Sequence, residues 1–388
     1  MNCNEVISAD LLPDARGIRL GVERTEKILK ELSNPDEKLK IIHIAGTNGK
    51  GSTAEYFTCI LVAAGKKTGT FLSPQIYSFY DQIKIDGKSV SSELYEKYKV
   101  NAEATEFEKL TATALALFAG EGCEWAVIEC GMGGKTDATN AISKKELAVI
   151  NSVSLEHTDY LGATVREICA QKAGIIKNCP VIINAHQTKE AREYFAQYRF
   201  ADKLEQIFEG GFVYGGKTFA LKAEGCLQPC NAACAIEGAR LLGIDESAIE
   251  LGVAQCLPRG RLEKFFIGGR EYILDGAHNP EAFVPLKKYL LSRDCFRTVI
   301  FGCLKDKDID GCLHNVIANE VIAVECPSER TRSLEDVAAL CRRYFGKNRV
   351  DTAESVSLAL DKASGEVVAV CGSFTILEEA KRWIEKRL

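Results

Sequence analysis

A glycine-rich loop that carries a lysine offers the clearest chemistry in this sequence. It reads GTNGKGST over residues 46–53 and follows an apolar segment, 41–45, that is typical of a buried strand. Gly46 and Gly49 allow the backbone to wrap closely around anionic oxygens without Cβ clashes. The ammonium group of Lys50 would neutralise phosphate charge. The segment therefore predicts a cradle for the phosphates of a nucleoside triphosphate.

Two hydroxyl residues, Ser52 and Thr53, follow the lysine and are expected to open a helix. Backbone amides at a helix N-terminus favour an anion, and a hydroxyl group there can also bind Mg²⁺. The loop departs from the strict G-x-x-x-x-G-K-[ST] pattern, because Gly51 stands between Lys50 and Ser52. The alternative is a tight strand-to-helix turn with an incidental lysine. The order of strand, glycines, lysine, hydroxyls and helix favours the phosphate site.

A candidate metal ligand, Glu129, ends the apolar segment WAVIE and is followed by the glycines of CGMGG. A carboxylate at a strand tip beside a phosphate loop suits a Mg²⁺ ion or orients a water molecule. The alternative is a glutamate that caps a helix or faces solvent, and we favour the metal site.

A histidine and a lysine further along the chain are candidate functional residues only if they lie near that metal site. His157 follows Glu156 in NSVSLEHTDYLG, again where a strand gives way to a loop, and Lys172 lies in the helical segment REICAQKAGIIK. Taken alone, a structural histidine and a surface lysine are the better interpretations.

Alternating strands and helices must position these residues. The expected strands of the first series span 41–45, 67–72, 125–130, 147–152 and 180–184, and the expected helices 20–32, 53–64, 92–98, 106–119 and 165–176. A second series has strands at 271–277, 297–304, 320–326 and 366–373 and ends in the helix TILEEAKRWIEKRL. Such alternation predicts parallel, doubly wound sheets that bind ligands at the carboxyl ends of their strands.

The chain is therefore expected to form two α/β domains. Residues 1–265 would hold a P-loop-type, doubly wound and mostly parallel sheet, and residues 266–388 a smaller, Rossmann-like domain. Between the two series, segment 186–225 has glycine pairs at 210–211 and 215–216, which indicate hairpin turns.

Composition narrows the class of protein. The 388 residues are 46% hydrophobic and carry a formal net charge of −5, so a basic surface for nucleic acid is not expected. The amino-terminal segment MNCNEVISADLLPDARG lacks the pattern of a secretory signal, and no apolar run approaches the roughly 18 residues of a membrane span. We expect a cytoplasmic protein without a membrane partner. Many of the 16 cysteines stand singly in apolar runs, which fits reduced thiols.

One cluster of cysteines could in principle bind a metal. Cys226, Cys230 and Cys234 lie four residues apart in CLQPCNAAC. Pro229 is expected to start a helix after Cys226, and no fourth Cys or His lies nearby to complete a tetrahedral site. Incidental core cysteines are the favoured interpretation.

Together, these segments resemble the folylpolyglutamate synthase and dihydrofolate synthase family, within the wider group of Mur-type amide ligases. The resemblance covers most of the chain, in the family's order, through LGVERTEKILKEL, HIAGTNGKGST, FLSPQ, FEKLTATALALF, IECGMGGKTDATN, SLEHTDYLGATVREICAQKAGI, GRLE, ILDGAHNP, FGCLKDKD and CGSF. GTNGKGS in place of the strict P-loop, combined with LDGAHNP, makes it specific.

The resemblance implies a set of site residues. Those implied to bind ATP are Gly46, Thr47, Asn48, Gly49, Lys50, Gly51, Ser52, Thr53, Asn231, Arg261, Asp275, His278 and Asn279. Those implied to bind two Mg²⁺ ions are Ser52, Ser73, Glu129, His157 and Lys172, with Lys172 carbamylated. Lys50, Lys172 and His157 are the implied catalytic residues. Carbamylation would make chemical sense, because an unmodified ammonium group would repel Mg²⁺.

The implied reaction is the ATP-dependent addition of L-glutamate to a folate or to pteroate. A substrate carboxylate would take the γ-phosphate of ATP, and the amine of glutamate would then displace phosphate from the acyl phosphate. Family members are usually monomeric, so a monomer is expected. Two alternatives remain: a Mur-type ligase for a different carboxylate, and a weakly active nucleotide-binding paralogue. A kinase or plain NTPase fits least well.

The sequence differs from the usual family pattern at several positions. Gln75 replaces a histidine, Asp81-Gln82 replaces Glu-Arg, Lys135 replaces an arginine, Glu156 replaces an aspartate and Leu227 replaces a histidine. Loss of a guanidinium at two of them matters most, because lysine cannot reproduce its bidentate fork and glutamine has no charge. The changes lie in segments expected near the acyl substrate.

Overall fold

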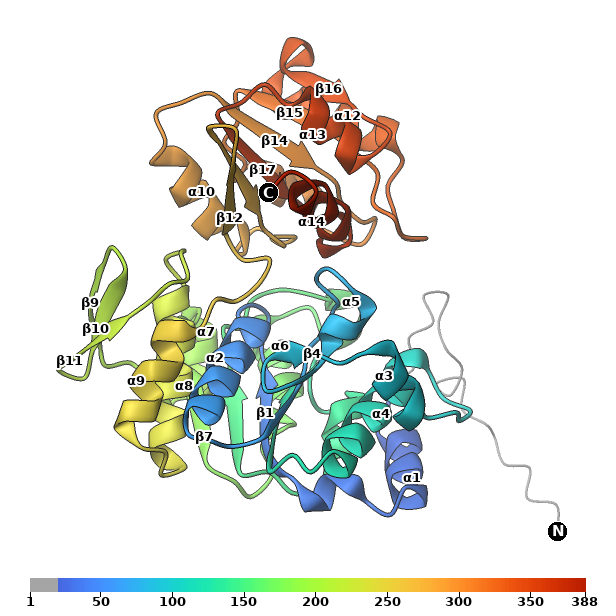
Figure 1. Cartoon of the computed structure of the whole chain (residues 1–388), viewed down its shortest axis with the longest axis vertical. Coiled ribbons are helices and arrows are strands. Elements are labelled where there is room, and N and C mark those ends of the chain that lie inside the picture. The colour runs from blue at the N-terminus through green and yellow to red at the C-terminus, as the bar shows by residue number, and fades with distance from the viewer. Residues whose placement is uncertain (1–19) are drawn as a thin grey trace.

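The protein forms two α/β units, one above the other in Figure 1. The structure, a computed structural model, describes residues 20–388, so the amino-terminal segment used in the expectation about a secretory signal lies outside the described residues. No helix of residues 20–388 is long and apolar enough to cross a bilayer.

The amino-terminal unit is built on an eight-stranded sheet with the order β4-β3-β2-β5-β1-β6-β7-β8. Its strands are β1 Lys40–Ala45, β2 Thr68–Phe71, β3 Ile83–Ile85, β4 Lys88–Ser89, β5 Trp125–Glu129, β6 Leu147–Ile150, β7 Val181–Asn184 and β8 Arg199–Ala201. All neighbouring strands run parallel except β2, β3 and β4, which form an antiparallel edge. The expected doubly wound, mostly parallel sheet is confirmed.

Helices cover both faces of this sheet. They are α1 Glu23–Glu31, α2 Lys50–Ala63, α3 Ser92–Tyr98, α4 Glu106–Gly120, α5 Thr158–Leu161, α6 Val165–Ala173, α7 Lys189–Tyr194, α8 Gln228–Leu241 and α9 Glu246–Gln255, with 3₁₀ turns at Pro35–Lys38, Phe79–Gln82 and Ala138–Ala141. Ile42 and Ile44 of β1 face a core shared with α2 and α8, whereas Ile41 faces a core shared with α4. Because both faces are buried, β1 is apolar throughout its centre.

Helix α2 begins at Lys50, earlier than residue 53, where the sequence predicted it to start. Gly49 occupies the N-cap position with φ of 85°, a left-handed conformation that glycine adopts without strain. Ser52 and Thr53 therefore lie inside the first turn of the helix rather than at its opening. Lys50 is the first helical residue, so its side chain leaves the helix at the phosphate loop.

Two predictions about the middle of the chain are confirmed. The glycine pairs form the turns of a three-stranded antiparallel sheet made of β9 Leu204–Phe208, β10 Gly211–Tyr214 and β11 Lys217–Ala220. Helix α8 begins at Gln228 with Pro229 in its first turn, so Cys226 precedes the helix.

The carboxy-terminal unit has a six-stranded sheet with the order β12-β13-β17-β14-β15-β16. Its elements are β12 Glu263–Ile267, β13 Arg270–Leu274, α10 Phe283–Leu291, β14 Arg297–Phe301, α11 Ile309–Leu313, β15 Glu320–Ala323, α12 Leu334–Phe345, 3₁₀ turn Lys347–Arg349, β16 Val350–Thr352, α13 Val356–Lys362, β17 Val367–Cys371, 3₁₀ turn Phe374–Ile376 and α14 Leu377–Glu385. Strand β12 is antiparallel to β13, and the other pairs are parallel. The expected division after residue 265 falls inside β12, which belongs to this sheet.

The loops at the carboxyl ends of the strands in the two sheets face each other. Strands β1, β5 and β6 are parallel neighbours, so the loops that follow them gather at one edge of the first sheet. The same holds for the loops after β13, β14 and β17 in the second sheet. Hydrogen bonds between Asn48 and Asn279 join the two sets of loops. The fold thus places the two groups of sequence motifs on opposite walls of one cleft.

Candidate active site

The phosphate loop turns tightly over two asparagine side chains. A Cβ atom on Gly49 would lie 2.4 Å from Oδ1 of Asn231 and 2.6 Å from Nδ2 of Asn151. A Cβ atom on Gly46 would lie 2.6 Å from Cβ of Asn151. Both glycines are therefore required by close packing beneath the loop as well as by their positive φ angles.

Lys50 and Glu129 meet at the mouth of this loop. Nζ of Lys50 lies 3.9 Å from Oε1 of Glu129 and donates to the carbonyl oxygen of Thr47 at 3.2 Å. Gly51, the residue that breaks the strict P-loop pattern, faces the same carboxylate, and a Cβ atom there would lie 3.2 Å from Oε2 of Glu129. The extra glycine leaves space between helix α2 and the carboxylate.

Glu129 is a buried carboxylate that lacks full compensation of its charge. Its exposure is 5%, and Oε2 accepts a hydrogen bond from the backbone N–H of Ser73 at 3.2 Å. Burial raises the pKa of Glu129 to about 7, because Lys50 and the Ser73 N–H offset the loss of solvation only in part. A carboxylate in this state fits a divalent cation, and the structure brings Ser73 to it as expected.

Glu156 contrasts with Glu129, because three cationic or potentially cationic groups surround it. Its Oε1 lies 3.5 Å from Nζ of Lys307, 3.6 Å from Nε2 of His278 and 3.7 Å from Nε2 of His157. Burial alone would raise the pKa of Glu156, but His278 and Lys307 outweigh burial and hold the pKa well below its usual range. Lys307 and His278 belong to the carboxy-terminal unit, so Glu156 bridges the two units.

His157 and Lys172 are both held in states that suit metal binding. Burial lowers the pKa of His157 to about 4, so the imidazole is neutral at pH 7 and keeps a lone pair for a metal. Lys172 is 2% exposed, and burial and the nearby Lys50 lower its pKa to about 8. About a tenth of Lys172 is therefore a neutral amine at pH 7, far more than for an ordinary lysine, and this is the form that can react with carbon dioxide to give a carbamate.

The donor set for a metal depends on those two unusual ligands. Among residues 20–388, no three Asp, Glu, His or Cys side chains form a metal-binding group. Ser73 supplies a hydroxyl and a carbamylated Lys172 would supply a carboxylate, so the expected site fits the residues present only with that modification.

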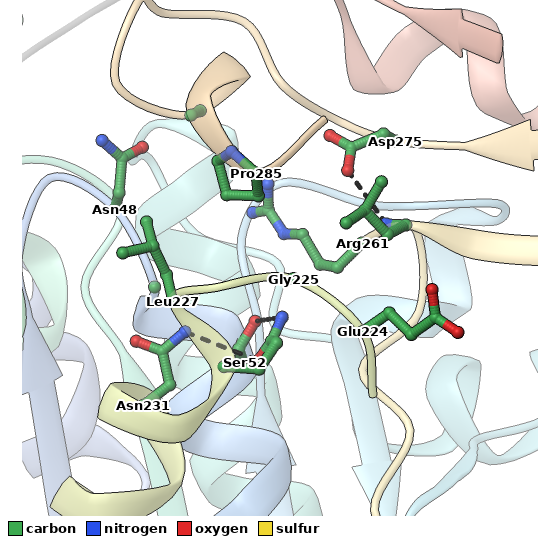
Figure 2. A pocket seen from close by; sticks show the side chains of 13 residues that line it. Asn48, Ser52, Glu224, Gly225, Leu227, Asn231, Arg261, Asp275 and Pro285 are labelled. Carbon is green, nitrogen blue, oxygen red and sulfur yellow. Dashed lines mark hydrogen bonds between the residues drawn. The ribbon is translucent and has the colours of Figure 1, made fainter. Parts of the chain in front are cut away.

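A separate pocket of about 460 Å³ opens beside the phosphate loop (Figure 2). Asn231 and Ser52 line one wall, and Arg261 and Asp275 line the opposite wall. Asp275 accepts hydrogen bonds from the backbone N–H groups of Leu262 at 2.9 Å and Ala277 at 2.8 Å, which fixes the GRLE segment against LDGAHNP. The structure thus brings the implied nucleotide contacts together beside Ser52.

The main cleft between the two units has a volume of about 1140 Å³. Its lining includes the expected site residues Thr47, Asn48, Gly49, Lys50, Ser73, Glu129, His157, Arg261 and His278. It also includes Gln75, which replaces the usual histidine of the family, and Lys307. The cleft is large enough for phosphates and a second substrate together.

Eight expected site residues are not part of this lining: Gly46, Gly51, Ser52, Thr53, Asn231, Asp275, Asn279 and Lys172. Ser52, Asn231 and Asp275 line the pocket beside the phosphate loop instead. Thr53 is fully buried beneath the loop, where its Oγ1 donates to the carbonyl oxygen of Asn231 at 3.4 Å. Asn279 exchanges side-chain hydrogen bonds of 2.9 and 3.2 Å with Asn48. Lys172 lies behind the cleft, in the buried part of α6.

Sequence reasoning did not identify Asn151 or Glu281. Asn151 directly follows β6, so the rule that ligands gather at strand ends could have found it. Oε2 of Glu281 accepts hydrogen bonds of 2.7 Å from both Asn48 and Ser154, and Oε1 lies 3.2 Å from Nε2 of His186. No sequence pattern indicated this contact, because its three partners come from three separate loops.

Models of two Mur ligase domains match most of the chain. The model of the Mur ligase middle domain matches residues 44–210, and that of the Mur ligase glutamate ligase domain matches residues 260–374. The chain is 31% identical over 413 residues to a probable dihydrofolate synthetase of Schizosaccharomyces pombe, which covers 95% of this chain and 99% of that protein. The chain belongs to the folylpolyglutamate synthase and dihydrofolate synthase family. As a member of this family, it is an ATP-dependent ligase.

Solved structures of this family share the whole fold. The folylpolyglutamate synthase of Mycobacterium tuberculosis, complexed with ADP and AMPPCP, is 29% identical and superposes with a TM-score of 0.83 over 94% of this chain and 95% of that chain. Escherichia coli FolC in complex with DHPP and ADP is 26% identical, with a TM-score of 0.84 over 97% and 95% of the two chains. The family resemblance and the fold class inferred from sequence are both confirmed.

Proposed function

We propose that the protein uses ATP to join the amine of L-glutamate to a carboxylate of a folate or pteroate. The observation that carries this proposal is the single cleft in which Lys50 and the buried Glu129 face His278 of the other unit. Family members with bound ligands support it: one holds DHPP and ADP, and a bifunctional folylpolyglutamate synthase/dihydrofolate synthase holds Mn, AMPPNP and L-glutamate.

ATP would lie across the phosphate loop, with its base in the pocket beside α8. The loop residues Gly46 to Thr53 would cradle the phosphates, and Lys50 would face the γ-phosphate. Asn231, Arg261 and Asp275 would contact the nucleoside, because they line the pocket next to Ser52. His278 and Asn279 would complete the site from the carboxy-terminal unit.

Mg²⁺ would be held by side chains next to the phosphate loop. We assign one ion to Ser52, Ser73 and Glu129, and a second to His157 and carbamylated Lys172. When bound, the ions would neutralise charge on the transferring phosphoryl group. The raised pKa of Glu129 and the neutral imidazole of His157 support this assignment.

Two displacements would follow without a protein nucleophile. A carboxylate oxygen of the folate forms a bond to the γ-phosphorus while the bond from that phosphorus to ADP breaks. The glutamate amine then bonds to the acyl carbon, phosphate leaves, and the amine loses a proton to form the amide. Lys50 would hold the transferred phosphoryl group in the first step, and the cleft would hold both substrates in register.

We also propose a division of labour between the units. The amino-terminal unit would bind ATP, and the carboxy-terminal unit, which begins with β12 at Glu263, would supply the glutamate site. From the net charge of −5 and the usual behaviour of the family, we propose a cytoplasmic monomer with only small molecules as partners.

A direct assay tests the function. Purified protein is incubated with ATP, Mg²⁺, L-glutamate and, in turn, dihydropteroate and reduced folates, and ADP and the mass of the pterin product are measured. We expect a mass gain of one glutamyl unit and its loss in Lys50→Ala. Lys66→Ala is the matched control, because Lys66 is an exposed lysine just beyond the other end of α2 and pairs with Glu124. Absence of a glutamyl product with every pterin would overturn the folate assignment.

A further inference from the structure

The loop that follows β2 belongs to the amino-terminal unit by connectivity but reaches into the other unit. At its start, the backbone N–H of Ser73 bonds to Glu129 beneath the cleft. Four residues later, Tyr77 belongs to a buried apolar cluster whose other buried members, among them Tyr272 and Trp383, all lie in the carboxy-terminal unit. A single short segment therefore contacts both walls of the cleft.

Tyr77 is held in this position by a buried hydrogen bond. The residue is 8% exposed, and its Oη donates to Oε2 of Glu263 at 2.5 Å. Burial and the negative charge of Glu263 raise the pKa of Tyr77, so the hydroxyl stays protonated and remains a donor. Glu263 is the first residue of β12 and thus a fixed point of the second sheet.

Cationic side chains complete the surroundings of the ring. Nζ of Lys381 lies 5.5 Å from the centroid of Tyr77 and 3.4 Å from Oε1 of Glu263, and the guanidinium of Arg259 lies 5.5 Å from the same centroid. The backbone N–H of Gly260 donates to Glu263 at 2.8 Å. The carboxylate that receives Tyr77 therefore has its own fixed donors and cannot swing freely.

The loop itself is locked behind Tyr77. Asp81 accepts hydrogen bonds of 3.0 Å from the backbone N–H groups of Tyr77 and Ser78, and one of 2.7 Å from Oγ of Ser89. Asp81 is one of the positions at which this chain departs from the usual family residue. A shift of Tyr77 would thus be transmitted along the loop rather than absorbed within it.

We propose that Tyr77 is a positioning residue for the acyl substrate. Its contact with Glu263 sets where Ser73 and Gln75 stand on the wall of the main cleft, and these residues lie beside Glu129. The loop that receives the carboxylate to be phosphorylated is thereby placed by the unit assigned to glutamate. This inference rests on the proposed function for the identity of the acyl substrate. The contact between Tyr77 and Glu263 is independent of that function.

The test compares Tyr77→Phe with Tyr289→Phe in the full-length protein. Both variants keep the ring and lose one hydroxyl that donates to a glutamate, but the Tyr289 hydroxyl bonds to Glu271 within the carboxy-terminal unit. We expect Tyr77→Phe to raise KM for the acyl substrate about fivefold or more while the Kd for ADP stays within about twofold. Hydrogen exchange of segment 73–82 should rise in Tyr77→Phe. Tyr289→Phe should change none of these values.

A conservative partner variant separates positioning from mere stability. Glu263→Gln keeps an oxygen that can accept from Tyr77, so its KM should rise less than that of Tyr77→Phe. The double variant should resemble Tyr77→Phe alone, because both changes act on one contact. Additive effects would contradict the proposal, and so would an unchanged KM together with unchanged exchange in segment 73–82.

The outcomes also distinguish this inference from the proposed function. Suppose that the wild-type protein adds glutamate to no pterin, but that exchange of segment 73–82 rises in Tyr77→Phe and stays unchanged in Tyr289→Phe. The folate assignment then fails, and the positioning role of the Tyr77–Glu263 contact is supported. If the wild-type protein is active and Tyr77→Phe matches it in every measurement, the positioning role of Tyr77 is refuted and the proposed function is supported.

Discussion

The phosphate loop and the loop after β2 both reach the carboxy-terminal unit, but they do so with different chemistry. At the polar interface, hydrogen bonds and charged contacts join the two units. Asn48 contacts Asn279 and Glu281, and Ser154 and His186 also contact Glu281. Glu156 contacts His278 and Lys307. At the apolar interface, Tyr77 belongs to a buried apolar cluster whose other buried members all lie in the carboxy-terminal unit. Both interfaces join the amino-terminal unit to the carboxy-terminal unit.

The difference indicates which interface can open. The Glu281 side chain is 23% exposed and that of His186 is 44% exposed, so water can replace their mutual contacts at modest cost. Removing Tyr77 from its cluster would expose a large ring and take away one of the hydrogen-bond donors of Glu263. We therefore expect the units to separate first at the polar interface, beside the phosphate loop, while the apolar interface acts as the pivot.

Glu129 lies between the two interfaces, with Ser73 on one side and Lys50 on the other. Glu129→Gln should reduce kcat about a hundred- to a thousandfold, because it removes the carboxylate that we propose binds Mg²⁺ next to the transferring phosphoryl group. The variant should nevertheless be more stable without nucleotide and metal. An unfolded glutamate ionises near pH 4.5, whereas Glu129 in the folded chain ionises at about 7.

Between those two pH values the folded chain holds a proton that the unfolded chain has lost. The free energy of unfolding of the wild-type protein therefore falls as pH rises through this window, by up to about 3 kcal/mol at pH 8. Glutamine does not ionise, so Glu129→Gln should unfold at a higher temperature than wild type at pH 8 and at nearly the same temperature at pH 5. Calorimetry at the two pH values measures this difference. Equal gains at both would show that charge burial is not its cause.

The apolar interface should dominate stability. Tyr77→Ala should lower the free energy of unfolding by about 3 kcal/mol, because it leaves a cavity among buried side chains and removes one hydrogen-bond donor of Glu263. Phe79→Ala is the matched control from the same loop, and it should cost less than about 1 kcal/mol because Phe79 is 40% exposed. Denaturant titration of both variants makes the comparison. A similar cost for the two would mean that Tyr77 is no more anchored than its neighbours.

The sequence predicted one interface better than the other. Asn48, His278 and Asn279 lie in motifs that the family resemblance singled out, and the structure brings these motifs together where strands end. Tyr77 gave no such indication. An aromatic residue in a loop next to a proline-containing turn is compatible with many environments, and its partner Glu263 is distant in sequence.

The helices and strands also differed in how well the sequence predicted them. The central, apolar strands β1, β5 and β6 and the helices between them were predicted because their pattern is set by burial on both faces. The strands β3, β4, β8, β12 and β16, which lie at or next to a sheet edge, were missed, because their pairing depends on neighbours rather than on their own pattern. The start of α2 was misplaced because Gly49 can cap a helix from a left-handed conformation that no other feature of the loop reveals.

Loss of Glu281 should open the polar interface selectively. Glu281→Ala leaves Asn48, Ser154 and His186 without their shared acceptor, and we expect kcat/KM for ATP to fall about tenfold, or about 1.4 kcal/mol. Glu281→Gln keeps one acceptor oxygen and should fall by less. The free energy of unfolding should change by less than about 1 kcal/mol in both. Steady-state kinetics and denaturant titration test this, and a stability loss as large as that of Tyr77→Ala would erase the distinction between the interfaces.

A change in ionic strength should give the smallest of these differences between the two interfaces, measured as hydrogen exchange. Raising the ionic strength from about 0.05 M to about 0.5 M shortens the Debye length severalfold and weakens attraction between charges where solvent reaches the polar interface, as at the 23% exposed side chain of Glu281. Hydrogen exchange of segment 152–158 should therefore quicken by about two- to threefold, whereas that of segment 73–82 should stay constant, because Tyr77 is buried and its contact with Glu263 is shielded from ions. The Glu281→Ala variant serves as the control, since its exchange in segment 152–158 should already be fast and insensitive to salt. Equal salt sensitivity in the two segments would mean that the whole cleft opens as one, with no pivot at Tyr77.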